Sequence, residues 1–127
     1  DRKAGMRALK HMTGLARERV RGDRQLIIFP EGTRRPVGAE PDYKSGVAQV
    51  YVACGVQCLP VALNSGLFWP RRTFLRYPGT IVVEFLPLIP SGLSRKEFQA
   101  RVSEAIETAT DRIVEEGRRE QARLGGA

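Results

Sequence analysis

Residues that commonly ligate metals are scarce in this sequence, which has one histidine, His11, and two cysteines, Cys54 and Cys58. A zinc site takes three or four ligands of these kinds, so the sequence predicts no metal site. One pair of cysteines is weak evidence for an oxidising compartment. We therefore expect both thiols to be reduced and to pack as small core side chains.

Long apolar runs are also missing. No stretch approaches the roughly 18–20 apolar residues that cross a bilayer, and no signal-peptide pattern is present. The sequence therefore predicts no membrane span in these residues. Because the chain starts at Asp1 instead of methionine and enters a helical pattern at once, we expect a segment of a longer protein, with residues 1–127 forming a single partial domain.

Acidic residues are the minority, since 14 Asp and Glu stand against 21 Lys and Arg, for a net charge of +7. Most of the excess lies in residues 1–24, whose net charge is +5. A one-sided basic surface attracts phosphate or carboxylate ligands or an acidic membrane face. Arginine supplies 17 of the cations, which fits phosphate recognition and equally fits the codon bias of a genome. Hydrophobic residues make up 42% of the chain, which excludes disorder for most of its length.

The hydrophobic residues of the chain follow two kinds of pattern, helical spacing and short continuous runs. Apolar residues at helical spacing predict helices over residues 3–21, 45–53 and 94–118. Short apolar runs typical of covered strands occupy residues 26–29, 57–63 and 81–86. Strands separated by helices predict an α/β fold, with part of a mixed, largely parallel sheet flanked by helices.

The C-terminal helix has the clearest start signal. Ser94 is followed three residues later by Glu97, as in a capping box. One side of the helix is apolar and carries Phe98, Val102, Ala105, Ile106, Ala109 and Ile113. We expect the tail after Arg118 to fray. Elsewhere Gly55 is placed to end the second helix, and residues 64–66, Asn-Ser-Gly, predict a turn.

The most informative segment is residues 29–34, Phe-Pro-Glu-Gly-Thr-Arg, which directly follow the predicted strand 26–29. In open α/β sheets, ligands bind beyond the carboxyl ends of the strands. Gly32 permits a tight turn, Arg34 can hold a phosphate through two parallel N–H bonds, and Glu31 can orient a cation or accept from a hydroxyl. The segment predicts a site for a phosphate monoester or a similar anion. The alternative is a polar turn whose charges are solvated.

This string, followed by residues 43–46, Tyr-Lys-Ser-Gly, and residues 58–63, Cys-Leu-Pro-Val-Ala-Leu, resembles the glycerolipid acyltransferase family in order and spacing. The resemblance spans roughly residues 1–90. Its bacterial members, the 1-acyl-sn-glycerol-3-phosphate acyltransferases, transfer a fatty acyl group from acyl-CoA or acyl carrier protein to lysophosphatidic acid, giving phosphatidic acid. The resemblance implies a glycerol-3-phosphate acyltransferase-like fold and no cofactor besides that acyl donor as co-substrate.

The resemblance also implies roles for the residues of the first string. Glu31 and Arg34 would bind the acceptor, with Arg34 on its phosphate, while Gly32 and Thr33 would shape the turn. Lys44 would add a second positive charge at that phosphate.

Two further positions match the family less specifically. Pro60 would position the acyl donor or support the acceptor pocket, and Arg2, after Asp1, would be the end of a block whose arginine also faces phosphate. The plainer alternatives are that Lys44 flanks a helix, that Pro60 only shapes a strand, and that Arg2 is a solvated end residue.

The chain departs from the family at its catalytic block. The family uses a His-x-x-x-x-Asp string, in which the histidine takes the proton of the acceptor hydroxyl, but His11 is followed five residues later by Ala16. Losing such a base costs about 10²–10⁴-fold in rate. We therefore expect a surface role for His11, and a chain that carries the acceptor-binding half of the site without the catalytic pair.

Residues 67–72, Leu-Phe-Trp-Pro-Arg-Arg, have the composition of a bilayer-surface contact, with aromatics for the interface and arginines for acidic headgroups. The alternative is a loop whose aromatics complete the core while its arginines stay in water. The first interpretation fits an enzyme at the cytoplasmic face of the membrane, either peripheral or anchored by segments absent from these residues.

Two other classes of function compete. A non-catalytic binder of phosphate or anionic lipid would carry the same acceptor residues and differ only in the missing catalytic block. A nucleic-acid-binding domain would explain the basic helix and the arginine-aromatic stretch. The sequence has no ribonucleoprotein motif, zinc ligands or helix-turn-helix, so we expect no nucleic-acid partner.

Overall fold

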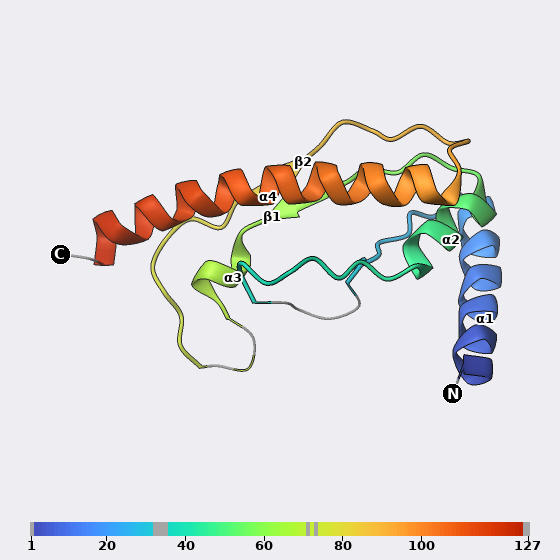
Figure 1. Ribbon diagram of the computed structural model, residues 1–127, viewed down its shortest axis with the longest axis horizontal. Helices are drawn as coiled ribbons and strands as arrows, with labels where there is room; N and C mark the ends of the chain where they lie inside the picture. Colours follow the sequence, from blue (N-terminus) through green and yellow to red (C-terminus); the bar gives the residue numbers. More distant parts are fainter. Residues whose placement is uncertain (1, 32–35, 71, 73, 126–127) are drawn as a thin grey trace.

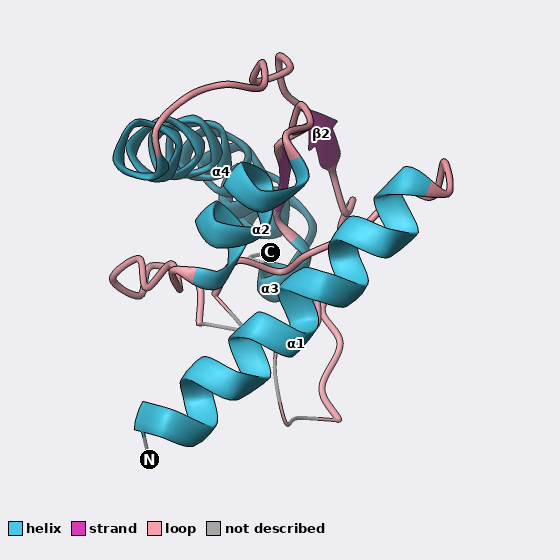
Figure 2. Cartoon of the chain, turned by 90° about the vertical axis from the view of Figure 1, so that its right-hand side faces the viewer, coloured by secondary structure: helices cyan, strands magenta, loops and turns pink. Residues whose placement is uncertain are grey.

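The computed structural model describes residues 2–31, 36–70, 72 and 74–125. In chain order its elements are α1 (Arg2–Arg21), α2 (Gly46–Cys54), β1 (Val61–Leu63), α3 (Ser65–Phe68), β2 (Val83–Phe85) and α4 (Arg95–Gly125). Figure 1 shows α4 running along most of the length of the molecule, with α1 and α2 at the end where α4 begins. Seen from that end, α1 crosses in front of α2 (Figure 2).

The three predicted long helices are confirmed. At the start of α4 the Glu97 N–H donates to Ser94 Oγ at 3.1 Å, as the capping signal predicts. The helix continues past Arg118 to Gly125, further than expected. An ion pair one turn apart links this last part to the preceding turn, with Arg119 Nε 3.6 Å from Glu115 Oε1, and such pairs stabilise exposed helical turns. Gly55 ends α2 in the left-handed conformation, with φ 63°, as predicted.

The sheet differs from the prediction. β1 and β2 pair antiparallel, with Val61 opposite Phe85 and Leu63 opposite Val83. No parallel pair occurs among the described residues. Two parallel strands need a crossover connection, usually a helix. The described residues between β1 and β2 contain one helix, the short α3, and the chain returns beside β1 in the opposite direction.

The predicted strand at residues 26–29 is absent. These residues have no regular structure, and the side chains of Ile27 and Phe29 are 82% and 74% exposed. An apolar run becomes a strand only where another strand pairs with its backbone, and none of the described strands lies along this one. The strand was predicted from the composition of the run alone, and composition does not show whether another strand lies beside it.

Two apolar clusters form the core along α4. The first is built around Phe98, which is fully buried and whose ring stacks on Tyr51 at a centroid distance of 3.8 Å and an angle of 6°. The second joins Ala62 of β1 to Ala109 and Ile113 of α4. Every residue of the apolar stripe predicted for α4 is buried or half-buried. The two cysteines are free thiols and only half-buried, so they lie at the margin of the core.

Asn64, which the sequence assigned to a turn, is a buried link between three elements. Its Oδ1 accepts from the Val82 N–H at 2.7 Å, and its Nδ2 donates to the Ile113 carbonyl at 3.4 Å. Its own N–H donates to the Val82 carbonyl at 3.3 Å. The amide therefore closes the segment 65–81 at its base and fixes that base to α4.

Replacing Asn64 by leucine is expected to lower the free energy of unfolding by about 1–3 kcal/mol, because buried N–H and C=O groups lose their partners. Urea denaturation of both chains measures the difference. Gln57→Leu is the matched control, since the Gln57 amide is exposed and its loss is expected to change stability by at most about 0.5 kcal/mol. Equal effects of the two substitutions would contradict the linking role.

Candidate functional site

The backbone brings the two predicted acceptor-binding strings together. The Lys44 N–H donates to the Pro30 carbonyl at 2.8 Å, so the residues that flank the loop 31–43 meet at its neck. The described residues of this loop have irregular backbone. Glu31 follows the neck on one side and Tyr43 precedes it on the other, so the described start of the first string lies beside the start of the second.

Tyr43 connects this neck to α4. Its hydroxyl donates to Glu107 Oε1 at 2.6 Å, and its carbonyl accepts from Gln99 Nε2 at 3.3 Å. Burial raises the pKa of the Tyr43 hydroxyl far above its ordinary value, and the carboxylates of Glu107 and Glu31 raise it further. The hydroxyl therefore stays protonated and acts as a hydrogen-bond donor. The effect of Glu31 shows that its charge lies within electrostatic reach of this hydroxyl.

Sequence reasoning missed Gln99 and Glu107. They lie two turns apart on the face of α4 that also carries Ser103, and polar residues at that spacing beside an apolar stripe are the signal that identifies them. Their partner Tyr43 is 56 and 64 residues away in sequence, so no local pattern reveals the pairing.

Ionisation of Tyr43 is expected to destabilise the fold in alkali. Because folding raises this pKa, the stabilisation is complete below the ordinary tyrosine value of about 10 and is lost as the pH rises above it. Urea unfolding at about pH 8 and about pH 11 is therefore expected to show a larger loss of stability for the native chain than for Tyr43→Phe. Identical losses in both chains would show that Tyr43 is not the group responsible.

A shallow groove borders this neck. It has a volume of about 660 Å³ and lies between the segment 41–48 and the first turns of α4. Arg95 and Lys96 line it, as do Tyr43 and Gln99, and the buried Oε1 of Gln99 has no hydrogen-bond partner among the residues that the structure describes. A largely apolar groove with cationic residues in its wall suits a ligand with an apolar body and an anionic group.

The other predicted residues fall in different surroundings. The Lys44 side chain is exposed, and its Nζ lies 2.6 Å from Asp42 Oδ2. Pro60 is fully buried just before β1, and its carbonyl accepts from the Leu86 N–H at 2.9 Å. Arg2 begins α1, and its side chain lies outside the described structure. The ligand roles of Lys44, Pro60 and Arg2 stay predictions.

Three of the predicted acceptor residues, Gly32, Thr33 and Arg34, lie outside the described residues. Their roles also stay predictions. His11 is exposed on α1, as expected for a surface residue. The described groups around the neck are hydrogen-bond donors, cations and carboxylates, and of these the donors and cations are the groups that can bind an anionic group.

Comparison with known proteins gives several relatives. The chain is 38% identical over 87 residues to the 1-acyl-sn-glycerol-3-phosphate acyltransferase of Pseudomonas aeruginosa, covering 68% of the chain and 34% of the relative. It is 31% identical over 104 residues to human 1-acyl-sn-glycerol-3-phosphate acyltransferase beta, covering 80% and 37%. It is 29% identical over 86 residues to the enzyme of that name from Cocos nucifera, covering 67% and 28%.

The chain thus spans about a third of the length of the relatives that it matches. No protein-family model matches it, and no solved structure does.

Proposed function

Because the chain belongs to the family of 1-acyl-sn-glycerol-3-phosphate acyltransferases, we propose that it supplies the acceptor-binding part of an enzyme that acylates 1-acyl-sn-glycerol-3-phosphate to phosphatidic acid. The observation that carries this proposal is the neck hydrogen bond from Lys44 to Pro30, which joins the two strings shared with the family. The acyl donor is acyl-CoA or acyl carrier protein.

The reaction defines what the chain must do. The free hydroxyl oxygen of the acceptor bonds to the thioester carbonyl carbon, the carbon–sulfur bond breaks, and the hydroxyl proton passes through a base to the leaving sulfur. Arg34 holds the acceptor phosphate, Glu31 orients the cations around it, and Lys44 adds positive charge when the ligand displaces Asp42. Holding the phosphate fixes the position of the hydroxyl, which is the contribution of binding residues to such a step.

A second candidate function follows from the catalytic string. Since His11 is followed five residues later by Ala16, these residues hold no His-x-x-x-x-Asp pair. A non-catalytic binder of phosphate or anionic lipid would use the same neck without turnover. The two functions differ in whether the chain supports acyl transfer when a catalytic pair is present.

A chimera separates them. In the Pseudomonas aeruginosa relative, the 87 matched residues are replaced by the corresponding residues of this chain. The chimera is expected to acylate 1-acyl-sn-glycerol-3-phosphate, with acyl-CoA and acyl carrier protein tested in turn as donors. A folded chimera that binds the acceptor and does not turn over would favour the non-catalytic binder.

The lipid substrate also bears on location. Within the described residues, no helix is both long enough and apolar enough to cross a bilayer. The proposed donors are cytoplasmic molecules and the acceptor is a membrane lipid. We therefore place the site at the cytoplasmic face of the membrane.

A further inference from the structure

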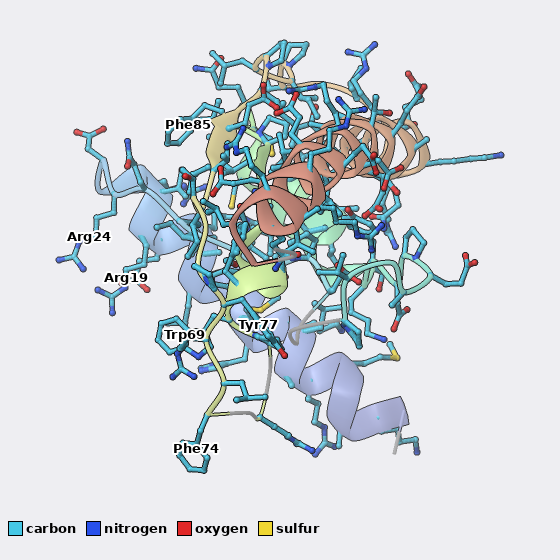
Figure 3. The ribbon with its side chains drawn as sticks, turned by 90° about the vertical axis from the view of Figure 1, so that its left-hand side faces the viewer. Arg19, Arg24, Trp69, Phe74, Tyr77 and Phe85 are labelled. Carbon is cyan, nitrogen blue, oxygen red and sulfur yellow. The ribbon has the colours of Figure 1, made fainter. Side chains whose placement is uncertain are left out.

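A loop with an apolar tip projects from the molecule between α3 and β2. Phe74 is fully exposed and Leu75 is 62% exposed, while Trp69 and Tyr77 are about half exposed. Figure 3 shows Phe74 at the outer end of the loop, with Trp69 and Tyr77 nearer the body. A fully solvated phenylalanine beside a solvated leucine leaves a large apolar area in water, and such surfaces commonly mark a binding function.

The base of this loop is fixed, so the tip is held away from the core. The Tyr77 N–H donates to the Phe68 carbonyl at 2.8 Å, and the Phe68 ring is buried. Gly79 crosses this ring so closely that a Cβ there would lie 2.0 Å from Phe68 Cε1. Gln121 of α4 donates to the Leu67 carbonyl at 2.9 Å. Phe68 thus completes the core, and the residues beyond it form the outward surface.

The charge of the loop has one sign. Residues 69–80 include arginines and no acidic residue. The Arg76 guanidinium lies 4.1 Å from the centroid of the Trp69 ring, which places a cation beside an exposed aromatic side chain. Arg72 is exposed next to the tip. Aromatic and cationic groups held side by side suit the boundary between lipid headgroups and acyl chains.

We propose that the described residues of this loop, 69, 70, 72 and 74–77, form a bilayer contact of this protein. Phe74, Leu75 and Trp69 enter the interface, while Arg72 and Arg76 contact the phosphates of anionic headgroups. The proposal rests on the proposed function, because an enzyme that takes its acceptor from a membrane must reach the membrane surface. It resolves the two sequence interpretations of this stretch, since Phe68 serves the core and the later aromatics serve the surface.

Trp69 is the single tryptophan of the chain, so its fluorescence reports on this loop alone. The full chain is mixed with vesicles of phosphatidylcholine and phosphatidylglycerol, with pure phosphatidylcholine, or with vesicles that carry brominated acyl chains. We expect a blue shift and bromine quenching of the emission with the anionic vesicles, and much weaker effects with the neutral ones. An emission spectrum that no vesicle changes would overturn the proposal.

Variants then identify the residues. Phe74→Ser with Leu75→Ser is expected to weaken binding to anionic vesicles about tenfold or more, which corresponds to the burial of one large apolar side chain or more. Met6→Ser is the matched control, because Met6 is 60% exposed near the start of α1, away from the loop. Equal losses in both variants, or none in the first, would overturn the proposal. Arg72→Gln with Arg76→Gln is expected to reduce binding to the anionic vesicles only.

Two measurements keep this proposal separate from the proposed function. Acylation by the chimera in detergent micelles needs no bilayer contact, so its failure would count against the enzyme and leave vesicle binding unaffected. Sedimentation of the full chain tests the alternative occupant of the apolar tip. A dimer that Phe74→Ser converts to monomer, without vesicle binding by the native chain, would assign the tip to self-association instead.

Discussion

Replacing Arg34 by alanine in the chimera is expected to lower kcat/KM for 1-acyl-sn-glycerol-3-phosphate about 10²-fold. A guanidinium holds a phosphate through two charge-assisted hydrogen bonds. Hydrogen bonds to charged groups contribute about 1.5–3 kcal/mol each, so losing the pair raises the barrier by about 3 kcal/mol or more. Initial rates measured at several acceptor concentrations give this change in kcat/KM. Arg34→Lys keeps the positive charge but lacks the planar guanidinium, so its kcat/KM is expected to lie between those of the unsubstituted chimera and of Arg34→Ala.

The neighbouring Arg35 provides the control. Arg35→Ala removes the same charge from the same loop, and we expect it to change the rate much less than Arg34→Ala. If the two variants lose activity equally, general positive charge and not phosphate gripping is responsible. The neutral acceptor 1-acylglycerol gives a second comparison, because without a phosphate its slow turnover is expected to be the same with and without Arg34. Near-normal acylation of the phosphate-bearing acceptor by Arg34→Ala would reject the assigned role.

Replacing Phe98 by alanine is expected to reduce the free energy of unfolding by about 3–5 kcal/mol. Phe98 is fully buried at the centre of the first core cluster, and its ring is stacked on the ring of Tyr51. The Tyr51 hydroxyl donates to the Pro90 carbonyl and accepts from the Leu93 N–H, so a loosened Tyr51 also weakens the turn that precedes α4. A loss of this size is a large share of the roughly 5–15 kcal/mol typical of folded domains.

Urea denaturation monitored by circular dichroism tests this expectation. Phe74→Ala removes the same atoms from a fully exposed ring, and its effect is expected to stay within about 0.5 kcal/mol. A cost below about 1 kcal/mol for Phe98→Ala would place the main stabilising contacts elsewhere.

The helices could be predicted because their signals are local. The apolar stripe of α4, the cap at Ser94 and the stop at Gly55 each depend on residues within a few positions of one another. The strands could not be predicted to the same degree. The run at residues 26–29 has strand composition, but pairing depends on a neighbour that local sequence does not specify. Likewise, the amino-acid composition of β1 and β2 does not reveal whether the two strands pair in parallel or antiparallel.

In the candidate site, too, local sequence strings could be identified and contacts between distant residues could not. The strings at residues 29–34 and 43–46 were identified from sequence, while the backbone contact between Pro30 and Lys44 is visible only in the structure. The attachment of Tyr43 to Gln99 and Glu107 was not predicted, because it joins positions far apart in the chain. The fixed base of the 69–77 loop depends on contacts of Phe68 with Gly79, which are close in the folded chain and separated in sequence.

The neck of the 31–43 loop is closed by two main-chain atoms, the Lys44 nitrogen and the Pro30 oxygen. Main-chain closure is independent of the side chains within the loop, so evolution or an engineer can exchange, shorten or lengthen its interior while α2 and the core keep their places. Under the proposed function, selectivity for different headgroups can therefore change in this loop at little cost in folding.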